Sequence, residues 1–279
     1  MKTGSYTGLR FIGCLLFLLC IISMSGCVGK AEQAQETGAL SGEGVGSGEE
    51  TGAGQQENEE KPDITEESVK ESLSEAVSID IAEEKKVDVD YSQAFQGING
   101  CAAVYVPEDN SSYFYNKEMC IEQASPYSTF KIISALMGLH NGVIADETTA
   151  MEYNGTQYHN SAWNKDLSLR EAFQTSCIWY FRQVIDAVGS AEVKKELEEL
   201  RYGNCNITEW EGGDVNPLPE LNGFWLDSSL RISPWEQVQV LARIFEGGSC
   251  YTEEETQILR SIMQNDTENG LILYGKTGT

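Results

Sequence analysis

The sequence predicts a mixed α+β domain over residues 91–279, preceded by a signal peptide and an acidic linker. Strand-like alternation occurs at both ends of this region and helical periodicity occupies its middle, an order typical of an α+β domain. The hydrophobic content of 41% is enough to bury a substantial core in a chain of 279 residues.

Residues 1–27 are predicted to be a lipoprotein signal peptide. Lys2 and Arg10 precede an apolar run over residues 11–22, which is short for a permanent membrane span. Small residues precede Cys27 as in a lipoprotein cleavage box, with Met24 at the first position, where Leu is usual. We therefore expect a lipid on Cys27 that anchors an extracytoplasmic protein to the membrane. Secretion without a lipid and an uncleaved anchor are the alternatives.

Residues 28–90 are predicted to be a disordered acidic linker. The segment is rich in Gly, Ser, Gln and Glu and has almost no aromatic residue, so it cannot bury enough apolar surface to offset its ordering entropy. Residues 31–90 contain 18 acidic and 4 basic residues, which favours an extended, self-repelling tether. The chain's net charge of −25, without a basic stripe, argues against nucleic-acid binding.

The folded region opens with a predicted β-hairpin, because residues 101–106 and 112–115 alternate around a turn at residues 107–110. Helical periodicity predicts that helices follow. They are expected over residues 128–141, 169–187, 191–200 and 234–245, the last with Ser233 as its N-cap and Pro234 at its first position. An apolar run over residues 270–276 predicts a late strand.

The cysteines do not form an obvious disulfide framework or metal site. Of the eight, two lie in the signal peptide and a third is Cys27, so the remaining five leave at least one unpaired. Cys101 and Cys120 flank the predicted hairpin and could be bridged after export. No cysteine pair has ligand spacing and the two histidines have no evident partners, so no metal is expected.

The first motif with chemistry is Ser128-Thr129-Phe130-Lys131. A hydroxyl and an amine three residues apart on a helix lie on one face and can touch. A lysine can take the proton of a serine only if its surroundings favour the neutral amine, and Phe130 and nearby apolar residues could provide that desolvation. Backbone N–H groups of the first turn, including that of Ser128, could stabilise an oxyanion. Taken alone, Ser-x-x-Lys is more often a helix cap followed by a solvated lysine.

Two further motifs follow in order. Ser176-Cys177-Ile178 stands within the helix predicted over residues 169–187 and provides a second hydroxyl that could relay a proton. Lys276-Thr277-Gly278 ends the predicted late strand, where a lysine can attract a carboxylate and a glycine allows close approach of a ligand. Each motif is weak alone, but the three in this order are the signature of serine β-lactamases and penicillin-binding proteins.

The sequences flanking these motifs resemble class D β-lactamases over about residues 95–279. They read SPYSTFKI at 125–132, GVI at 142–144, WNKD at 163–166, YGN at 202–204 and FWLDSSLRIS at 224–233. The resemblance implies an antiparallel sheet flanked by helices, with a helical subdomain. It also implies hydrolysis of small β-lactam molecules through an acyl-enzyme.

The resemblance assigns a role to each catalytic residue. Ser128 would be acylated by the lactam carbonyl, and Lys131 would carry carbon dioxide as a carbamate that serves as general base. A lysine in an apolar pocket has a lowered pKa, and its neutral amine can add carbon dioxide. The indole N–H of Trp225 would hold the carbamate, with a buried core aromatic as the alternative, and Ser176 would pass a proton to the lactam nitrogen.

The resemblance also implies the substrate-binding residues. Lys276, Thr277 and Gly278 would contact the substrate, and the backbone N–H of Thr279 would join that of Ser128 in the oxyanion hole. Ile178 stands where the family usually has Val and would keep an apolar wall beside the lysine.

This chain departs from the family in two respects. Tyr127 occupies a position where a small residue is common, which would narrow the pocket. The chain stops one residue after the Lys-Thr-Gly motif, whereas the family continues through another strand and a closing helix. We therefore expect the domain to be incomplete at its C-terminus.

Other functions compete with the hydrolase. β-Lactam sensor domains resemble class D enzymes but stay acylated, and the third residue of their second motif tends to be polar, where this chain has Ile178. Cell-wall D,D-peptidases share the three motifs but lack the string at 224–233. A catalytically silent lipoprotein is the last alternative.

Overall fold

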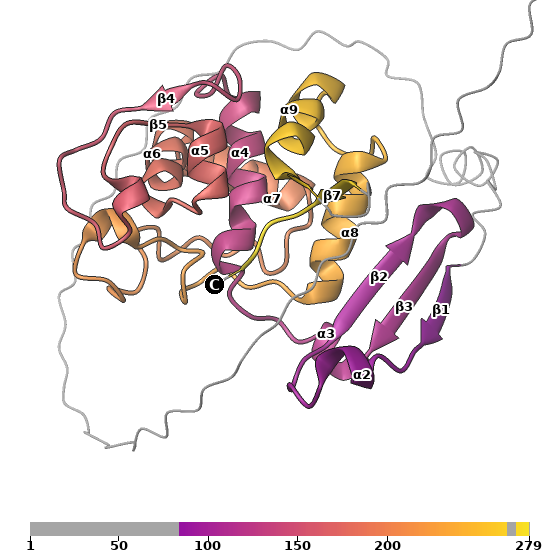
Figure 1. Cartoon of the computed structure of the whole chain (residues 1–279). Helices are drawn as coiled ribbons and strands as arrows, with labels where there is room; N and C mark the ends of the chain where they lie inside the picture. Colours follow the sequence, from indigo (N-terminus) through magenta and orange to yellow (C-terminus); the bar gives the residue numbers. More distant parts are fainter. Residues whose placement is uncertain (1–83, 267–271, 279) are drawn as a thin grey trace, which may run out of the picture. The chain divides into compact units, whose positions relative to one another are not determined.

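The computed structural model describes residues 84–266 and 272–278. The predicted signal peptide with Cys27, most of the predicted linker, and Thr279 lie outside the described residues. The described part has the predicted α+β fold (Figure 1). None of its helices is both long and apolar enough to cross a membrane.

The helices and strands are, in chain order, β1 (Lys85–Asp88), α2 (Ser92–Phe95), β2 (Ala102–Val106), β3 (Ser111–Tyr115), α3 (Lys117–Cys120), α4 (Lys131–His140), β4 (Ala150–Met151), β5 (Leu167–Ser168), α5 (Leu169–Gln174), α6 (Ile178–Val188), α7 (Ser190–Glu199), α8 (Pro234–Phe245), α9 (Glu253–Met263), β6 (Gln264–Asp266) and β7 (Ile272–Tyr274). Short 3₁₀ helices are η1 (Pro107–Asp109), η2 (Tyr127–Phe130), η3 (Ser161–Trp163) and η4 (Pro219–Leu221).

The predicted β-hairpin is present as β2 and β3, which pair antiparallel with Val104 opposite Tyr113. Strand β1 pairs parallel with the other edge of β3, so the sheet order is β1-β3-β2. The prediction that the linker extends to residue 90 is therefore wrong at its end. The segment Lys85–Asp88 is as polar as the linker before it, and only the edge of β3 makes it a strand by providing hydrogen-bond partners for its backbone.

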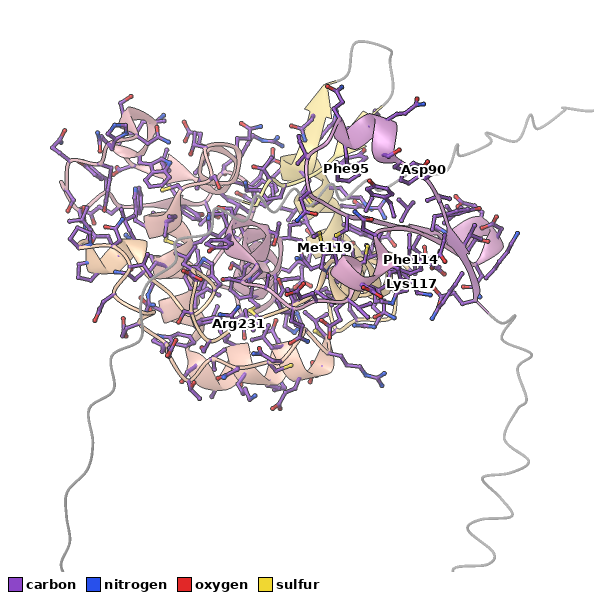
Figure 2. The ribbon with its side chains drawn as sticks, turned by 90° about the horizontal axis from the view of Figure 1, so that it is seen from below. Asp90, Phe95, Phe114, Lys117, Met119 and Arg231 are labelled. Carbon is purple, nitrogen blue, oxygen red and sulfur yellow. The ribbon has the colours of Figure 1, made fainter. Side chains whose placement is uncertain are left out.

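One face of the hairpin packs on α8 through a small apolar cluster. Phe114 contacts the ring of Trp235 edge-on, with ring centroids 4.9 Å apart. Met119 and Val238 pack against the same cluster, and the Nζ of Lys117 lies 5.6 Å from the centre of the Phe114 ring. Figure 2 labels Phe114, Lys117 and Met119, which lie in the same region of the view. This cluster joins the sheet to the helical part of the fold.

Helix α4 lies in the middle of the larger core, with α6 and α9 packed against it (Figure 1). Every residue from Lys131 to Leu139 is buried, so this helix is covered all round. Gly138 allows α6 to approach, because a Cβ there would lie 2.7 Å from Val184 Cγ1. The amine of Lys131, at the first position of α4, is the one ionisable group among the buried residues of this helix.

The helix predicted over residues 169–187 is interrupted, and this corrects the expected setting of Ser176. Helix α5 ends at Gln174, α6 begins at Ile178, and Ser176 has a left-handed backbone with a φ of 57°. The carbonyl of Thr175 accepts a hydrogen bond from Trp163 Nε1 at 3.1 Å. A distant indole thus satisfies a carbonyl at the break, a tertiary contact that helical periodicity does not reveal.

Two of the other predicted helices are confirmed, one begins differently, and one observed helix was not predicted. The helix over residues 234–245 is confirmed as α8, with Ser233 in a capping box, and α7 matches the helix expected over residues 191–200 within one residue. The helix expected from residue 128 begins with the 3₁₀ turn η2 before α4. Helix α9 is not among the predictions, although Thr252 and Glu255 form a capping box that marks its start.

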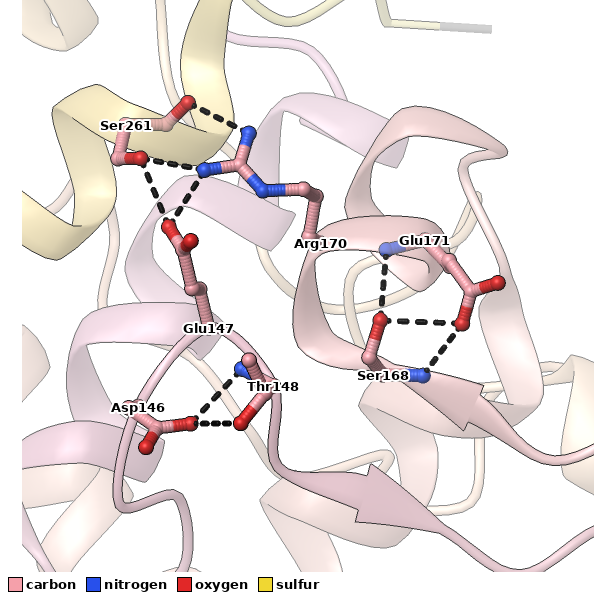
Figure 3. A network of polar contacts seen from close by, with 7 residues as sticks. All are labelled: Asp146, Glu147, Thr148, Ser168, Arg170, Glu171 and Ser261. Carbon is pink, nitrogen blue, oxygen red and sulfur yellow. Dashed lines mark hydrogen bonds and ion pairs between the residues drawn. The ribbon is translucent and has the colours of Figure 1, made fainter.

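A polar network ties α9 to α5 (Figure 3). Arg170 donates one hydrogen bond to the carbonyl of Ser261 at 3.0 Å and others to the Ser261 hydroxyl and the Glu147 carboxylate. Helix α9 leads directly into β6, which pairs antiparallel with β7. The network therefore anchors the base of the hairpin whose second strand ends just before Lys276.

We expect Arg170→Ala to lower the free energy of unfolding by about 1–2 kcal/mol, because it removes three hydrogen bonds and leaves Glu147 without its cation. The matched control is Lys165→Ala, which removes the exposed ion pair with Glu171 and should change stability by less than about 0.5 kcal/mol. Urea unfolding of both variants measures the difference. Equal losses would show that the network contributes no more than an ordinary surface pair.

Candidate active site

A strained turn presents Ser128 at the start of the central helix. Tyr127 has a left-handed backbone with a φ of 46°, and its N–H donates to the Trp225 carbonyl at 3.0 Å. The carbonyl of Pro126 accepts hydrogen bonds from the backbone N–H of Thr129 at 3.1 Å and from its hydroxyl at 2.6 Å. A non-glycine residue at positive φ is energetically costly, and these bonds hold it in place. Ser128 itself is almost fully buried.

The amine of Lys131 contacts this serine. Lys131 Nζ lies 3.0 Å from Ser128 Oγ, and the whole lysine side chain is buried. Burial, together with the positive charge of Lys276, lowers the pKa of Lys131 from 10.5 to about 7. Near neutral pH a large fraction of these amines is therefore uncharged and able to accept a proton. The ring of Phe181, whose centre is 5.9 Å from Nζ, contributes to the apolar surroundings.

Ser176 completes a chain of three polar groups. Its hydroxyl donates to Ser128 Oγ at 2.9 Å. The left-handed backbone at the break between α5 and α6 brings this hydroxyl to Ser128. Ser128 Oγ is thus bracketed by an amine from α4 and a hydroxyl from the α5–α6 connection, an arrangement suited to moving a proton on and off one oxygen.

Trp225 has a buried donor with no acceptor. The side chain is fully buried, and its ring lies 5.5 Å from Phe130, the neighbour of Lys131 in sequence. Its Nε1 has no hydrogen-bond partner among the described residues. An unsatisfied buried N–H costs about 1–3 kcal/mol, so such a group in a protein core indicates a missing partner. An acceptor, neutral or anionic, would fit this position.

The segment that follows β7 runs beside the serine turn, whereas the sequence predicted a strand up to residue 276. A Cβ on Gly278 would lie 2.9 Å from Thr129 Cγ2, so this glycine permits close packing next to Ser128. Lys276 is half-buried, its Nζ lies 5.8 Å from the centre of the Phe173 ring, and it donates to the Thr277 carbonyl at 3.2 Å. Burial lowers the pKa of Lys276 to about 8. At neutral pH Lys276 is mostly charged and available to an anion.

The remaining sequence-predicted residues are placed as follows. Ile178 is half-buried and begins α6. The preceding residue, Cys177, is fully buried, and burial raises the pKa of its thiol to about 12, which makes it a poor nucleophile. Thr277 is exposed in the segment after β7, and Thr279 lies outside the described residues. Tyr127 is 37% exposed, and partial burial, together with the charge of Asp227, raises the pKa of its phenol.

Two aromatic residues of the site are not among the sequence predictions. Phe181 lies near the amine of Lys131, and Phe173 near that of Lys276. Their rings also contact each other, with centroids 6.3 Å apart. Their separation by eight residues in an apolar stretch marks them as core residues. Only the fold places them beside the two amines.

Comparisons with known proteins identify the family of the chain. The penicillin binding protein transpeptidase domain matches residues 99–279. The chain is 30% identical over 194 residues to the probable beta-lactamase YbxI of Bacillus subtilis, covering 70% of this chain and 68% of that protein. A crystal structure of a class D beta-lactamase from Sebaldella termitidis is 32% identical, with a TM-score of 0.62 over 70% of this chain and 76% of that one.

A regulatory protein is similar to the same extent. The chain is 30% identical over 192 residues to the regulatory protein BlaR1 of Bacillus licheniformis. The match covers 68% of this chain but 30% of BlaR1, so the chain spans about a third of the length of this relative. Sequence similarity alone therefore does not separate an enzyme from a sensor.

The buried amine predicts a pH-dependent cost to stability. Because the pKa of Lys131 in the folded protein is about 7 rather than 10.5, the unfolded chain binds more protons between these pH values. The cost is full below pH 7 and disappears as the pH rises to about 10.5. We expect Lys131→Met to raise the free energy of unfolding by roughly 2–4 kcal/mol at pH 7, with a smaller gain at higher pH.

Unfolding titrations at several pH values, in buffer depleted of carbon dioxide, measure this difference. Lys85→Met, which replaces an exposed lysine of β1, is the matched control and should leave the pH dependence unchanged. If Lys131→Met is less stable than the wild type at every pH tested, the conclusion that burial of this amine costs stability is wrong.

Proposed function

The chain belongs to the penicillin binding protein transpeptidase domain family, and on this premise we propose that it is a class D-type serine β-lactamase. The observation that carries the proposal is the chain of contacts from Lys131 Nζ to Ser128 Oγ at 3.0 Å and from Ser128 Oγ to Ser176 Oγ at 2.9 Å. It supplies a nucleophile, a base and a proton donor within one buried cluster.

Acylation follows from these contacts. The neutral amine of Lys131 takes the proton of Ser128 as the serine oxygen attacks the lactam carbonyl. The backbone N–H of Ser128, in the first turn η2, would donate to the oxyanion. As the ring C–N bond breaks, Ser176 gives its proton to the lactam nitrogen. The protonated amine of Lys131 would then give its proton directly to the Ser176 oxygen, because the acylated Ser128 oxygen carries no proton to relay.

Trp225 supports the presence of carbon dioxide on Lys131. The residues fit that group, because the amine has a lowered pKa and the indole N–H beside Phe130 lacks an acceptor. When bound, the carboxyl group would supply an anionic base for hydrolysis of the acyl-serine. Trp225 would donate its N–H to one of the oxygens, while Phe181 would limit the access of water to the amine side chain.

Lys276 is proposed to attract the substrate's carboxylate. The chain has a net charge of −25, so an anionic substrate needs a local cation. Lys276 is half-buried beside Phe173, which strengthens its attraction for an anion relative to a fully solvated lysine. Thr277 and Gly278 follow it toward the serine turn and would line the same side of the substrate, with the backbone N–H of Thr279 completing the oxyanion site.

We further propose that the protein works outside the cytoplasm, anchored to the membrane by a lipid on Cys27. The acidic segment between Cys27 and β1 would hold the folded domain away from the membrane surface. Such a position would let the hydrolase meet β-lactams before they reach the cell wall enzymes.

A β-lactam sensor is the second candidate function, because the similarity to BlaR1 equals that to YbxI. Both functions share acylation of Ser128 and differ in the fate of the acyl group. Ile178 favours the enzyme, because the corresponding position in sensors tends to be polar. A cell-wall D,D-peptidase would instead act on peptide substrates.

Turnover of a chromogenic penicillin tests the proposal. We expect hydrolysis that increases when bicarbonate is added, and a loss of at least about 1000-fold in Ser128→Ala and Lys131→Ala. Intact mass spectrometry during the reaction should find little acylated protein. A stable adduct on Ser128 without turnover would support the sensor, and release of alanine from a D-Ala-D-Ala peptide without penicillin turnover would support the peptidase.

Replacing Trp225 tests the role of its unpaired N–H. We expect Trp225→Phe to lower turnover by about 10- to 100-fold in bicarbonate-free buffer, with partial recovery at high bicarbonate, because a charged acceptor loses its hydrogen bond while the packing is retained. Trp210→Phe is the control, because this tryptophan also contacts the ring of Phe224 but its Nε1 already donates to Asp186. Unchanged turnover in Trp225→Phe would show that this side chain contributes only to core packing.

A further inference from the structure

Two thiols meet beneath the β-hairpin, away from the proposed active site. Cys101 precedes β2, and Cys120 is the last residue of α3. Their exposed fractions are 1% and 0%, and both belong to the small cluster formed with Ala103 and Phe114. Trp235 of α8 covers this cluster through its contact with Phe114.

The backbone geometry brings the two sulfur atoms together. Cys120 Sγ lies 3.3 Å from the carbonyl oxygens of both Ala102 and Tyr115. Ala102 and Tyr115 face each other in the first pair of the β2–β3 ladder, so the sulfur of Cys120 sits against the end of the hairpin next to Cys101. The interaction between the two thiol groups lowers the pKa of Cys120 and raises that of Cys101.

We propose that Cys101 and Cys120 form a structural disulfide when the protein matures in an oxidising environment. The bond would close a loop of 20 residues that contains β2, η1, β3 and α3. The other cysteines of the described residues are in different settings. Cys177 is buried beside Lys131, Cys205 donates to the carbonyl of Leu197 at 3.3 Å, and Cys250 is exposed.

The chemistry is thiol–disulfide exchange with an organic disulfide. The thiolate of Cys120 attacks one sulfur of that disulfide and releases its other half as a thiolate. The thiolate of Cys101 then attacks the Cys120 sulfur of the mixed disulfide and releases the second half. Two protein thiols lose two protons and two electrons, and the organic disulfide is reduced to two thiols. Because both sulfur atoms are buried, exchange takes place during folding, before the cluster closes.

The bond would secure the segment that leads to the nucleophile. Helix α3 ends at Cys120, eight residues before Ser128, and Ala124 between them pairs with Ile232 in an isolated bridge. A disulfide at Cys120 would fix one end of this connection to the sheet. The proposal does not depend on the hydrolase activity, and its test uses no substrate.

Peptide mapping of the wild-type chain provides the first test. The full chain is refolded with oxidised and reduced glutathione, alkylated, and digested with trypsin without reduction. Cleavage after Lys117 separates the two cysteines, because residues 87–117 and 118–131 become different peptides. We expect these two peptides to be linked, two hydrogen masses lighter than their sum, and to separate on reduction. Recovery of both peptides alkylated, or linked to other cysteines, would overturn the proposal.

Thermal unfolding of variants provides the second test. Cys101→Ala, Cys120→Ala and the double variant should each unfold roughly 5–10 °C below the oxidised wild type, and reduction should lower only the wild type. Cys205→Ala, which removes a half-buried thiol elsewhere, should keep the response to reduction. If the decreases in melting temperature of the two single variants add up in the double variant, and are the same with and without reductant, the two thiols contribute by packing alone. If the variants fail to fold, the mapping of the wild type still decides.

Discussion

The buried contact between Lys131 Nζ and Ser128 Oγ at 3.0 Å is the interaction on which the rest of the structure depends. A lysine amine in a protein core is costly when charged, and this one is held at the first position of a helix that is covered on every side. Its pKa of about 7 results mainly from that enclosure, with a smaller contribution from the positive charge of Lys276. The same burial that makes the amine a base near neutral pH also makes it a burden on folding, as is common where activity requires a strained group.

The surrounding elements can be understood as the means of keeping that contact in place. Tyr127 and Ser176 both have left-handed backbones, which are rare for residues other than glycine, and each flanks or contacts the serine. Hydrogen bonds from distant parts of the chain stabilise these conformations: the Trp225 carbonyl receives the Tyr127 N–H, and Trp163 satisfies the carbonyl of Thr175. The Arg170 network and the proposed disulfide lie farther from the serine. The network holds the β6–β7 pair, and the disulfide would hold the segment that leads to the serine turn.

The two candidate functions, a hydrolase and a sensor, share the same steps up to formation of the acyl-serine. What separates them is whether a base remains next to the ester, and the unpaired Nε1 of Trp225 is the structural feature most relevant to that question. A donor with no acceptor in the core is unfavourable unless another group occupies the space beside it, and an acidic group on Lys131 would be such a group. In that case Trp225 contributes to hydrolysis without touching the substrate.

The sequence by itself determined the class of fold, the β2–β3 hairpin, the position of α8 and the three motifs, because alternation, caps and short strings are local properties. Their flanks were enough to indicate the family. It did not reveal β1, whose polar residues become a strand only at the edge of β3, nor the break at Ser176, where the indole of Trp163 binds a carbonyl twelve residues away. It also could not place Phe173 and Phe181 beside the two amines. Contacts between residues distant in sequence decide these features, and the burial that sets the pKa of Lys131 exists only once those contacts have formed.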